Sequence, residues 1–526
     1  MKMIWLLRLT CILLGTFGAA ASAQSSSPTN SSSTLVATAA RTCNQIQQRL
    51  GPSLVQSKVS GSQYEFGANA AWNLFNTDVN FQPTCIVFVT NAEDVQVAMS
   101  TIFENGADYA VQAGGHSAMK GWNTLTDGVL ISFVFMNATS YDQEKDTITL
   151  LPGIHWGDAL TELEPFGVAP LGARVNTVGT GLLLGGGISY LSPAFGYAAD
   201  TFVSLDVVLV NGTLVTATVD NEYADLFRAL KGGANRFGIV TRYEVQAVHV
   251  GGQDNQTWWG GLVIYPNSSA EAVLAAAAHH AQDVNDTHAA LLTIFGSVIN
   301  NDSSIEAVIE TAMFYNGPVS AFNETFAELL SIPSVESVLG PLSYLDVSDV
   351  LAQSANASGF GETFGASVLA GESITDTERG FADGEDPYLK TFSLFTNFTE
   401  TFAPSNKITT AILAFTPILD AQIRVGVERG RNAIDPPLGN GGFNAVQFSL
   451  TFAEGVLNIP EDIEAGRDFY FANAPSTPGL PLYINECDEK QHVFETYGGF
   501  EFLKTVYAKY DPTRFNVQHT RGPIGL

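Results

Sequence analysis

The sequence predicts an α+β protein. Short β-branched runs alternate with helical segments between residues 83 and 250, and an Asn-Gly turn joins two apolar runs into a hairpin. Later in the chain, longer strand-like runs alternate with helix-like ones. With 526 residues, of which 45% are apolar, the chain is long enough for more than one domain with a substantial core.

The first of these regions has a regular order of elements. The run at 85–89 is a strand, and Asn91 then caps a helix expected to continue to 104, with Glu93 and Asp94 in the first turn to suit the helix dipole. The turn at Asn211-Gly212 favours a two-residue hairpin. Further strands are expected at 109–112, 129–133, 147–150, 203–210, 213–218 and 238–243, and helices at 156–165 and 225–230.

Residues 251–470 predict a second unit, a sheet with helices on one face. Strands are expected at 258–265, 290–295, 408–415 and 446–452, and helices at 270–282, 322–330 and 420–434. His279 and His280 stand together on the first of these helices. Because no third ligand accompanies them, we expect surface residues rather than a metal site.

The N-terminus indicates export. Lys2 and Arg8 precede an apolar run at 11–17, and Ala21-Ser22-Ala23 forms a small-residue cleavage site, so residues 1–23 are expected to be a signal peptide. A membrane anchor is disfavoured because the apolar run is short and ends in this site. Residues 24–40, rich in Ser, Thr and Ala, are expected to form a mobile tail. The mature chain is thus expected to be secreted, extracellular and without a membrane partner.

Charge and sequons sharpen this expectation. A net charge of −29 excludes nucleic acid and anionic membranes as natural partners, and a charged fraction of 15% is low for a protein surface. Glycans at Asn-x-Ser/Thr sites would help solubility. Such sites occur at Asn30, Asn137, Asn211, Asn255, Asn267, Asn285, Asn301, Asn323, Asn356 and Asn397.

Cysteine use suits an oxidising compartment. Cys11 leaves with the signal, and Cys43, Cys85 and Cys487 remain. We predict a Cys43–Cys85 disulfide, which would tie the N-terminal segment to the first strand of the next domain, and a buried, unreactive thiol at Cys487. No spacing typical of a zinc site is present, so no metal is predicted.

Two glycine-rich strings are the strongest chemical signal. The first runs through Ala113, Gly114, Gly115, His116 and Ser117, and the second extends over 178–189. Consecutive glycines bring backbone N–H groups close to anionic oxygens, which an acidic protein with few bases needs for binding a diphosphate. Either string alone is as consistent with a tight turn. Together, beside a lone His, they favour a phosphate-bearing cofactor, although the spacing is neither that of a dinucleotide fold nor that of a P-loop.

Six ordered motifs resemble a known family. They are GGHSAMKGW (114–122), DGVLISF (127–133), PGIHWGDAL (152–160), TVGTGLLLGGGISY (177–190), FGYAAD (195–200) and LFRALKGGANRFGIVT (226–241). They resemble the FAD-linked oxidases of the vanillyl-alcohol oxidase superfamily, with its PCMH-type FAD-binding domain, and most closely the secreted berberine-bridge-enzyme-like branch of fungi. The resemblance resumes at 483–486 and 509–512.

The resemblance implies roles for residues. His116 stands where the family links FAD covalently to imidazole. Ala113, Gly114, Gly115 and Ser117 would cradle the pyrophosphate. The second string would run along the flavin, and a third group would hold the adenine side. These two groups are Gly179, Gly181, Gly185, Gly186, Gly187 and Ser189, and Gly238, Ile239 and Val240.

Two departures from the family pattern matter. Some relatives carry a second flavin link through a Cys at the position of Val175, so we predict a single covalent bond, through His116. Some also carry Tyr-x-Asn-Tyr near the C-terminus, where this chain has Tyr483-Ile484-Asn485-Glu486. Three roles are open here: Glu486 as general base, Tyr483 as general base, or a structural Glu486.

The expected architecture is a two-subdomain PCMH-type FAD-binding domain at 79–250 and an α/β substrate domain at 251–470, in which helices cover an antiparallel sheet. A segment at 24–78 precedes them, and 471–526 returns to the first domain. The resemblance implies an oxidase that passes hydride from an alcohol-type substrate to FAD and then to O2, giving H2O2, and we expect a monomer. Two alternatives are a flavin dehydrogenase or oxidative cyclase with poor O2 reactivity, and a non-catalytic flavin-binding surface protein.

Overall fold

The structure, a computed structural model, describes residues 30–59, 61–351, 359–371 and 386–526. The expected signal peptide at 1–23 and the sequon at Asn356 lie outside the described residues, as does the side chain of Asn30. No helix within the described ranges is long and apolar enough to cross a membrane.

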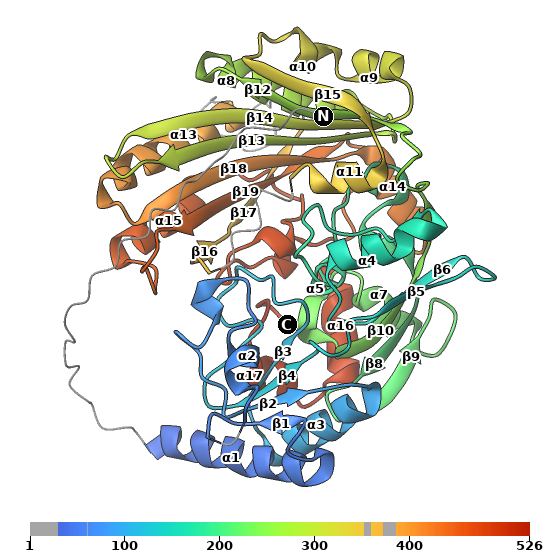
Figure 1. Ribbon diagram of the computed structural model, residues 1–526, viewed down its shortest axis with the longest axis vertical. Helices are drawn as coiled ribbons and strands as arrows, with labels where there is room; N and C mark the ends of the chain where they lie inside the picture. Colours follow the sequence, from blue (N-terminus) through green and yellow to red (C-terminus); the bar gives the residue numbers. More distant parts are fainter. Residues whose placement is uncertain (1–29, 60, 352–358, 372–385) are drawn as a thin grey trace.

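The lower part of the molecule in Figure 1 holds two small sheets from the first half of the chain. The four-stranded sheet has the order β1-β2-β4-β3, in which β2, β4 and β3 are parallel and helix α3 crosses from β2 to β3. The five-stranded sheet is antiparallel, in the order β5-β6-β10-β8-β9. The elements are β1 (Val55–Gln56), β2 (Cys85–Phe88), α3 (Ala92–Asn105), β3 (Tyr109–Gln112), β4 (Val129–Ser132), β5 (Thr139–Asp142), β6 (Thr147–Leu150), β8 (Phe202–Val208), β9 (Leu214–Ala217) and β10 (Ile239–Gln246).

Short elements fill the connections of this part. A two-stranded ladder joins β7 to β11, and helix α5 lies within the second glycine string. The bounds are α2 (Tyr64–Ala68), α4 (Trp156–Leu163), β7 (Val168–Ala169), α5 (Gly181–Leu184), α6 (Ser192–Phe195), α7 (Ala224–Ala229) and β11 (Val248–His249).

An eight-stranded antiparallel sheet forms the upper part of Figure 1. Its order is β15-β12-β14-β13-β18-β19-β16, with β17 also paired to β19. The strands are β12 (Trp258–Tyr265), β13 (Ala289–Ile299), β14 (Ile305–Asn316), β15 (Glu336–Leu342), β16 (Glu362–Thr363), β17 (Ala366–Ala370), β18 (Ile408–Ile418) and β19 (Phe443–Phe452). The α+β class with an antiparallel sheet covered by helices, as the sequence predicts, is confirmed.

Helices cover the outer face of this sheet, where α8 and α13 pack on β18 and α8 also packs on β19. The helices of this region are α8 (Ala270–Asp283), α9 (Val319–Thr325), α10 (Ala327–Ser331), α11 (Tyr344–Asp349), α13 (Pro387–Phe402), α14 (Asp420–Glu428) and α15 (Glu461–Asn473). Side chains alternate along β19, so Phe448, Leu450 and Phe452 enter the core under the helices. The intervening side chains of β19 therefore face the lower part of the molecule.

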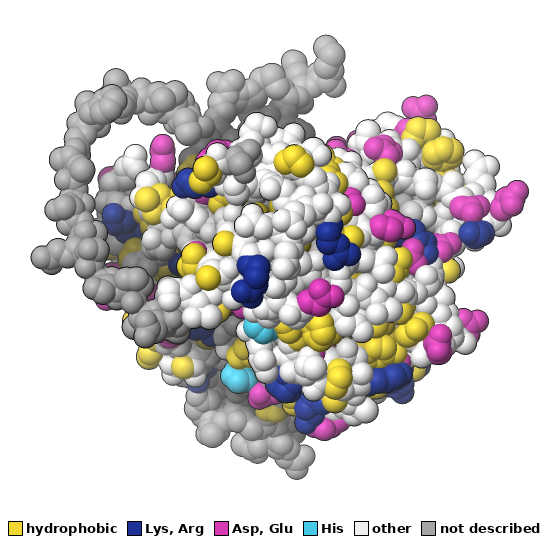
Figure 2. All heavy atoms as spheres, turned by 90° about the horizontal axis from the view of Figure 1, so that it is seen from below, with side chains coloured by type: hydrophobic (Ala, Val, Ile, Leu, Met, Phe, Trp, Pro, Cys, Tyr) yellow, Lys and Arg dark blue, Asp and Glu magenta, His cyan; other side chains and the backbone are white. Residues whose placement is uncertain are grey.

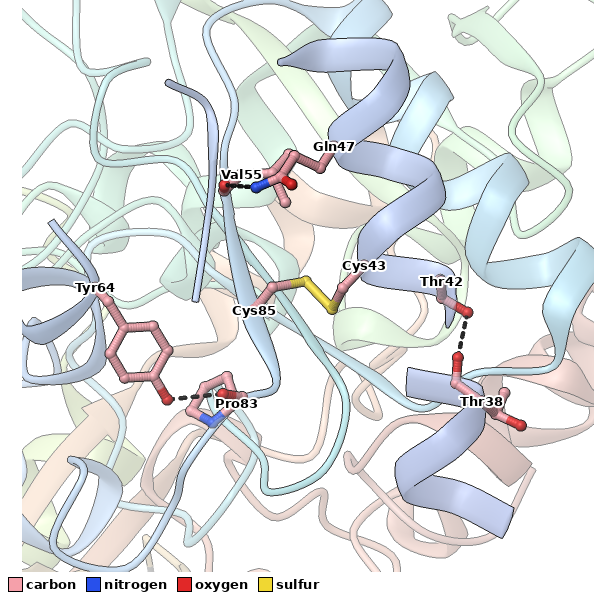
Figure 3. Close-up of a disulfide and its surroundings, with 8 residues drawn as sticks. All are labelled: Thr38, Thr42, Cys43, Gln47, Val55, Tyr64, Pro83 and Cys85. Atoms are coloured by element: carbon pink, nitrogen blue, oxygen red, sulfur yellow. Dashed lines mark hydrogen bonds between the residues drawn. A yellow bond between two sulfur atoms is a disulfide. The ribbon is translucent and has the colours of Figure 1, made fainter. Parts of the chain in front are cut away.

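The N-terminal segment is fastened to the first sheet. Figure 3 shows the disulfide between Cys43 on helix α1 (Asn30–Leu50) and Cys85 on β2, with Cα atoms 5.9 Å apart. The predicted pairing is therefore present. The expectation of a mobile tail at 24–40 is wrong from residue 30 onward, because α1 begins there and packs on α3. Ala favours a helix, and the weaker Ser and Thr are tolerated in a helix that packs one face against a neighbour.

The end of the chain returns to the lower part. It carries α16 (Phe500–Tyr510) and α17 (Phe515–His519). The buried Arg236 guanidinium donates to Asn516 Oδ1 at 2.8 Å and to the Pro523 carbonyl at 2.8 Å. Burial raises the pKa of the Cys487 thiol well above its usual value, which agrees with the predicted inert cysteine.

Two other expectations need correction. His280 is not a surface residue: it is 5% exposed, and its ring stacks on Phe326, because it lies on the inner face of α8 while its neighbour His279 is exposed. The helix expected at 420–434 ends at Glu428, where Arg429 and Gly430 leave helical geometry. Figure 2 shows one face of this charge-poor molecule, on which Lys and Arg side chains lie scattered rather than gathered.

Candidate active site

The two glycine strings meet at one point of the fold. A Cβ on Gly114 would lie 2.7 Å from the Cα of Gly179, and a Cβ on Gly179 would lie 2.6 Å from the Cα of Gly114. His155 closes the junction, since its Nε2 donates to the Gly114 carbonyl at 2.9 Å. Only glycine, which has no side chain, allows the two strings to approach so closely. No Cβ therefore covers the backbone of Gly114 and Gly179 where both line the cavity.

His116 lies beside this junction, and two neighbouring side chains hold its ring in place. Its ring stacks on Trp72, with centroids 4.0 Å apart, and its Nδ1 lies 3.2 Å from Thr177 Oγ1. Burial, and secondarily the neighbouring His155, lowers the pKa of His116 to about 4. The imidazole is therefore neutral at pH 7, which leaves a nitrogen lone pair available for bonding.

A cavity of about 460 Å³ opens in front of His116. Its lower wall comes from the glycine strings and β10, and its upper wall from the inward face of the large sheet, including Ile294, Ile412 and Gln447. This volume is that of a small-molecule site. The described residues hold no group of side chains that could bind a metal ion.

The structure brings most of the sequence-predicted residues to this cavity. The predicted residues that line it are Ala113, Gly114, Gly115, His116, Ser117, Gly179, Gly181, Gly238, Ile239, Val240, Tyr483 and Glu486. Gly185, Gly186, Gly187 and Ser189 do not line it. Gly186 and Gly187 have positive φ and turn the chain against Tyr197 and Ala198, so they shape the wall from behind.

Tyr483 and Asn485 fasten the second glycine string. The Tyr483 hydroxyl accepts the Ile188 N–H at 3.0 Å, and it also accepts from Asn485 Nδ2 at 3.0 Å. Asn485 Nδ2 reaches the Leu182 carbonyl at 2.9 Å as well, and its side chain fills the space that a Cβ on Gly185 would need. Burial raises the pKa of Tyr483, so its hydroxyl stays protonated.

Glu486 lies at the cavity in an ion pair with Arg174. Arg174 Nη2 is 2.9 Å from Glu486 Oε1, and Arg174 Nη1 donates to Thr416 Oγ1 of β18 at 2.8 Å. Arg174 thereby connects the lower part, the large sheet and the C-terminal segment. Burial raises the pKa of Glu486, although the nearby guanidinium of Arg174 opposes this shift. A carboxylate with a raised pKa is a stronger base and so a better proton acceptor.

Several cavity residues escaped the sequence reasoning. Trp72 and Glu362 have no motif around them and come from segments distant from the glycine strings, and Arg174 stands just before the second string without belonging to a motif. The one available signal was the polar alternation of 446–452, in which Gln447, Ser449 and Thr451 interrupt an apolar strand. Such alternation indicates a strand with one polar face, although it cannot indicate what that face meets.

The site fits a flavin dinucleotide. At Gly114, Gly115 and Gly179 a Cβ would collide with neighbouring backbone, so the chain there presents its backbone rather than side chains, and a Cβ on Gly181 would meet nothing within 4 Å. Neither glycine string contains Lys or Arg, so a diphosphate there would be held by backbone N–H groups. The apolar side chains Leu182, Ile239 and Val240 offer a wall for a ring system.

Comparison with known proteins agrees with this reading. Residues 83–218 match the FAD binding domain family model. A FAD-dependent monooxygenase of Arthrobotrys oligospora is 35% identical over 488 residues, covering 88% of this chain and 86% of the relative. With a FAD-dependent monooxygenase of Emericella nidulans and an uncharacterized FAD-linked oxidoreductase of Arthroderma benhamiae, the match covers only 60% and 55% of their own lengths.

Solved structures show the same fold. A variant of berberine-bridge-enzyme-like protein 1 of Physcomitrella patens superposes with a TM-score of 0.71, at 19% identity, over 92% of this chain and 100% of that one. Xylooligosaccharide oxidase of Myceliophthora thermophila gives a TM-score of 0.70, at 19% identity, over 94% and 100%. The chain, with its PCMH-type FAD-binding fold, therefore belongs to the family of FAD-dependent oxidoreductases that includes the Arthrobotrys oligospora monooxygenase, and it shares the fold of the solved berberine-bridge-enzyme-like proteins.

Proposed function

We propose that this protein is a secreted oxidase that converts an alcohol group of a sugar, polyol or secondary metabolite to a carbonyl group and reduces O2 to H2O2. The observation that carries the proposal is the single cavity in which His116, the glycine junction and the Arg174–Glu486 pair meet. The names of solved relatives, such as a xylooligosaccharide oxidase and a carbohydrate oxidase of Microdochium nivale, support the reaction class.

His116 would hold the cofactor by one covalent bond. Its neutral imidazole, fixed between Trp72 and Thr177, suits this role, and Val175 lines the cavity where relatives with a second link carry Cys. Gly114, Gly115 and Ser117 would hold the pyrophosphate through backbone N–H groups, and β10 residues would lie along the adenine side. When bound, FAD supplies hydride acceptance and electron transfer to O2.

Glu486 is the proposed general base. As the alcohol carbon loses hydride, its hydroxyl proton must pass to an acceptor, and Glu486 Oε2 is the carboxylate oxygen that the Arg174 bond at Oε1 leaves open. Arg174 holds the carboxylate in place and stabilises its ionised form. Tyr483 is not the proposed base, because its hydroxyl oxygen already accepts hydrogen bonds from Ile188 N–H and Asn485 Nδ2 and burial keeps it protonated.

Peroxide release from the holoprotein tests the proposal. The purified yellow protein should form H2O2 with at least one neutral sugar, polyol or aromatic alcohol, in amounts equal to the carbonyl product. Rapid mixing of the reduced protein with air should restore the oxidised flavin spectrum within seconds. Reduced flavin that persists in air for minutes would instead assign a dehydrogenase, and the absence of turnover with every probe would assign a binding protein.

Export and glycosylation belong to the same proposal. The side chains of eight sequon asparagines are exposed: Asn137, Asn211, Asn255, Asn267, Asn285, Asn301, Asn323 and Asn397. Glycans there, a cleaved peptide at 1–23, a monomeric state and the domain boundaries at 79–250 and 251–470 are proposed from the sequence. Enzymatic deglycosylation of protein collected from culture medium, followed by intact-mass measurement, tests the first two, and light scattering tests the monomer.

A further inference from the structure

A second buried carboxyl, Glu362, lines the cavity. It is 6% exposed and lies on β16, where it pairs across the ladder with Thr451 of β19. Residues directly opposite each other in an antiparallel pair project to the same face, so Glu362 and Thr451 both belong to the inward face of the sheet. Glu362 comes from a different wall than Glu486, which belongs to the C-terminal segment.

Two hydrogen bonds join the backbone of Glu362 to Asn73, the residue that follows Trp72. Its N–H donates to Asn73 Oδ1 at 3.0 Å, and its carbonyl accepts from Asn73 Nδ2 at 2.9 Å. Asn73 follows Trp72, which stacks on His116. Glu362 is therefore placed by the same loop that positions the proposed attachment site of the cofactor.

A polar strip continues from Glu362 along β19. Gln447, Ser449 and Thr451 project from alternate positions of this strand and line the cavity with it. Within the described residues, the Gln447 side-chain amide and the Ser449 hydroxyl form no hydrogen bond with another protein group. Polar side chains that a fold places in a cavity without protein partners are available to a ligand.

In the part of the chain that the structure describes, no Lys or Arg pairs with Glu362 as Arg174 pairs with Glu486. Among the described residues of the packed elements, Arg467 of α15 pairs with Asp488 and Glu464, and Lys120 donates to Asn458. The other titratable groups that line the cavity include His116, Tyr483 and the Arg174–Glu486 pair. Burial is the main cause that raises the pKa of Glu362 to about 8, with the Thr451 hydroxyl opposing it.

We propose that Glu362 is a substrate-binding residue that acts as an uncharged acid, donating its proton in a hydrogen bond to an oxygen of the substrate. With Gln447 and Ser449 it would select a neutral molecule bearing several hydroxyl or ether oxygens over an anionic one. This inference rests on the proposed function, because it describes how the same cavity binds the molecule that is oxidised.

The polar strip explains why a neutral ligand is favoured over a cationic one. A cation would suit an ionised Glu362, but it would leave the uncharged donors of Gln447 and Ser449 without acceptors. An anion would meet the Glu486 carboxylate in the same cavity, and Arg174, the one guanidinium lining it among the described residues, is already paired with that carboxylate. A hydroxyl-rich ligand satisfies all three side chains at once, since each hydroxyl both donates and accepts.

Infrared spectroscopy of the holoprotein tests the protonation state without any substrate. Wild type should show a carbonyl band of a protonated carboxyl that disappears as pH rises, with a midpoint near pH 8, and Glu362→Gln should lack it. Glu310→Gln is the matched control, because Glu310 is another carboxyl whose pKa is raised by burial, and this variant should retain the band. A wild-type spectrum that Glu362→Gln leaves unchanged between pH 6 and 10 would overturn the proposal.

Ligand binding tests the selectivity. The probes are cellobiose, cellobionate and benzylamine, and the readout is the perturbation of flavin absorbance without O2. Cellobiose should bind wild type, with a Kd that rises about tenfold from pH 7 to pH 9 as Glu362 ionises. Glu362→Gln should bind with little pH dependence, and Glu362→Leu about tenfold more weakly at every pH.

The outcomes separate this inference from the proposed function. Tighter binding of benzylamine or cellobionate than of cellobiose would overturn the selectivity, and so would a failure of cellobiose to bind. An unchanged pH dependence of Kd in Glu362→Gln would overturn the role of this carboxyl. If only the oxidase proposal is wrong, cellobiose should still bind and the infrared band of Glu362 should still titrate, but no peroxide should be released.

Discussion

Gly114 and Gly179 are packed backbone against backbone, so that a methyl group on either would lie within 2.7 Å of the other's Cα. The two residues are distant in sequence, and their junction forms the floor of the cavity beside His116. The close approach leaves no room for side chains on either string at the junction. The proposed cofactor site is consequently sensitive to a single added carbon at this junction.

Gly179→Ala should disrupt cofactor loading. The added Cβ would overlap the Gly114 backbone, which cannot move aside as a flexible side chain could, at a cost of about 1–3 kcal/mol in unfolding free energy. The ratio of flavin to protein absorbance and the melting temperature measure the effect. Gly340→Ala is the control, because a Cβ there meets nothing within 4 Å. Equal flavin content in both variants would argue against the proposed cofactor site.

Glu486→Gln should slow substrate oxidation. Loss of a positioned base typically costs 10²- to 10⁴-fold in rate, and we expect kcat/KM to fall by about that amount. In wild type, kcat/KM should rise with pH as Glu486 ionises, at a pH above the usual range for Glu because burial raises its pKa. This limb should vanish in the variant while flavin content stays normal. A variant with more than half of the wild-type rate would exclude Glu486 as the base.

Tyr483→Phe should affect stability more than chemistry. It removes the acceptor for Ile188 N–H and Asn485 Nδ2, and each lost buried hydrogen bond costs about 1–2 kcal/mol. Thermal unfolding of the holoprotein and kcat/KM should be measured together. A loss of kcat/KM as large as that of Glu486→Gln, without loss of stability, would reassign the base to Tyr483.

Removing the disulfide should loosen the N-terminal helix. For a separation of 42 residues, the loop-closure model gives about 4 kcal/mol of stabilisation. The double variant Cys43→Ala, Cys85→Ala should lower the unfolding free energy by about this amount in guanidinium titrations. Reducing agent should shift wild type similarly and leave the double variant unaffected. If the variant and wild type unfold at the same denaturant concentration, the bridge contributes nothing.

His280 should make the protein sensitive to acid. Burial lowers its pKa to about 4, so between pH 6.5 and 4 the unfolded chain binds a proton that the folded chain does not, and stability falls as pH falls. The loss attributable to this shift is about 3 kcal/mol. His280→Phe, which keeps the stack on Phe326, should flatten the decline of melting temperature with falling pH, whereas His279→Phe on the exposed side should not. Equal slopes in wild type and His280→Phe would contradict the buried neutral imidazole.

The parts of the fold that the sequence predicts are those with strong local signals. The strand around Val87 is a short β-branched run, the helix after Asn91 has a cap, and the hairpin at Gly212 has a turn that favours one geometry. The helix from residue 30 was missed because the Ser and Thr residues at its start have weak helix propensity, and its packing on α3 supplies what the local sequence lacks.

The candidate site divides in the same way. The glycine strings and His116 stand in recognisable sequence motifs. The cavity positions of Gly114, Gly115, His116, Gly179 and Gly181 were therefore predictable. Arg174 and Glu362 are not, because an isolated Arg or Glu is ordinarily a surface residue, and only the tertiary fold buries these two beside a common cavity. The burial of His280 likewise depends on which face of α8 meets the sheet.

Acid precipitation of the purified yellow protein tests the central claim most directly. If His116 carries the cofactor, the flavin absorbance of wild type should stay entirely with the precipitated protein, and the intact mass should exceed that of the chain by one FAD. His116→Ala should release all of its flavin to the supernatant, while Glu486→Gln should retain it. Flavin released in full from wild type, or retained by His116→Ala, would contradict the proposed single link through His116.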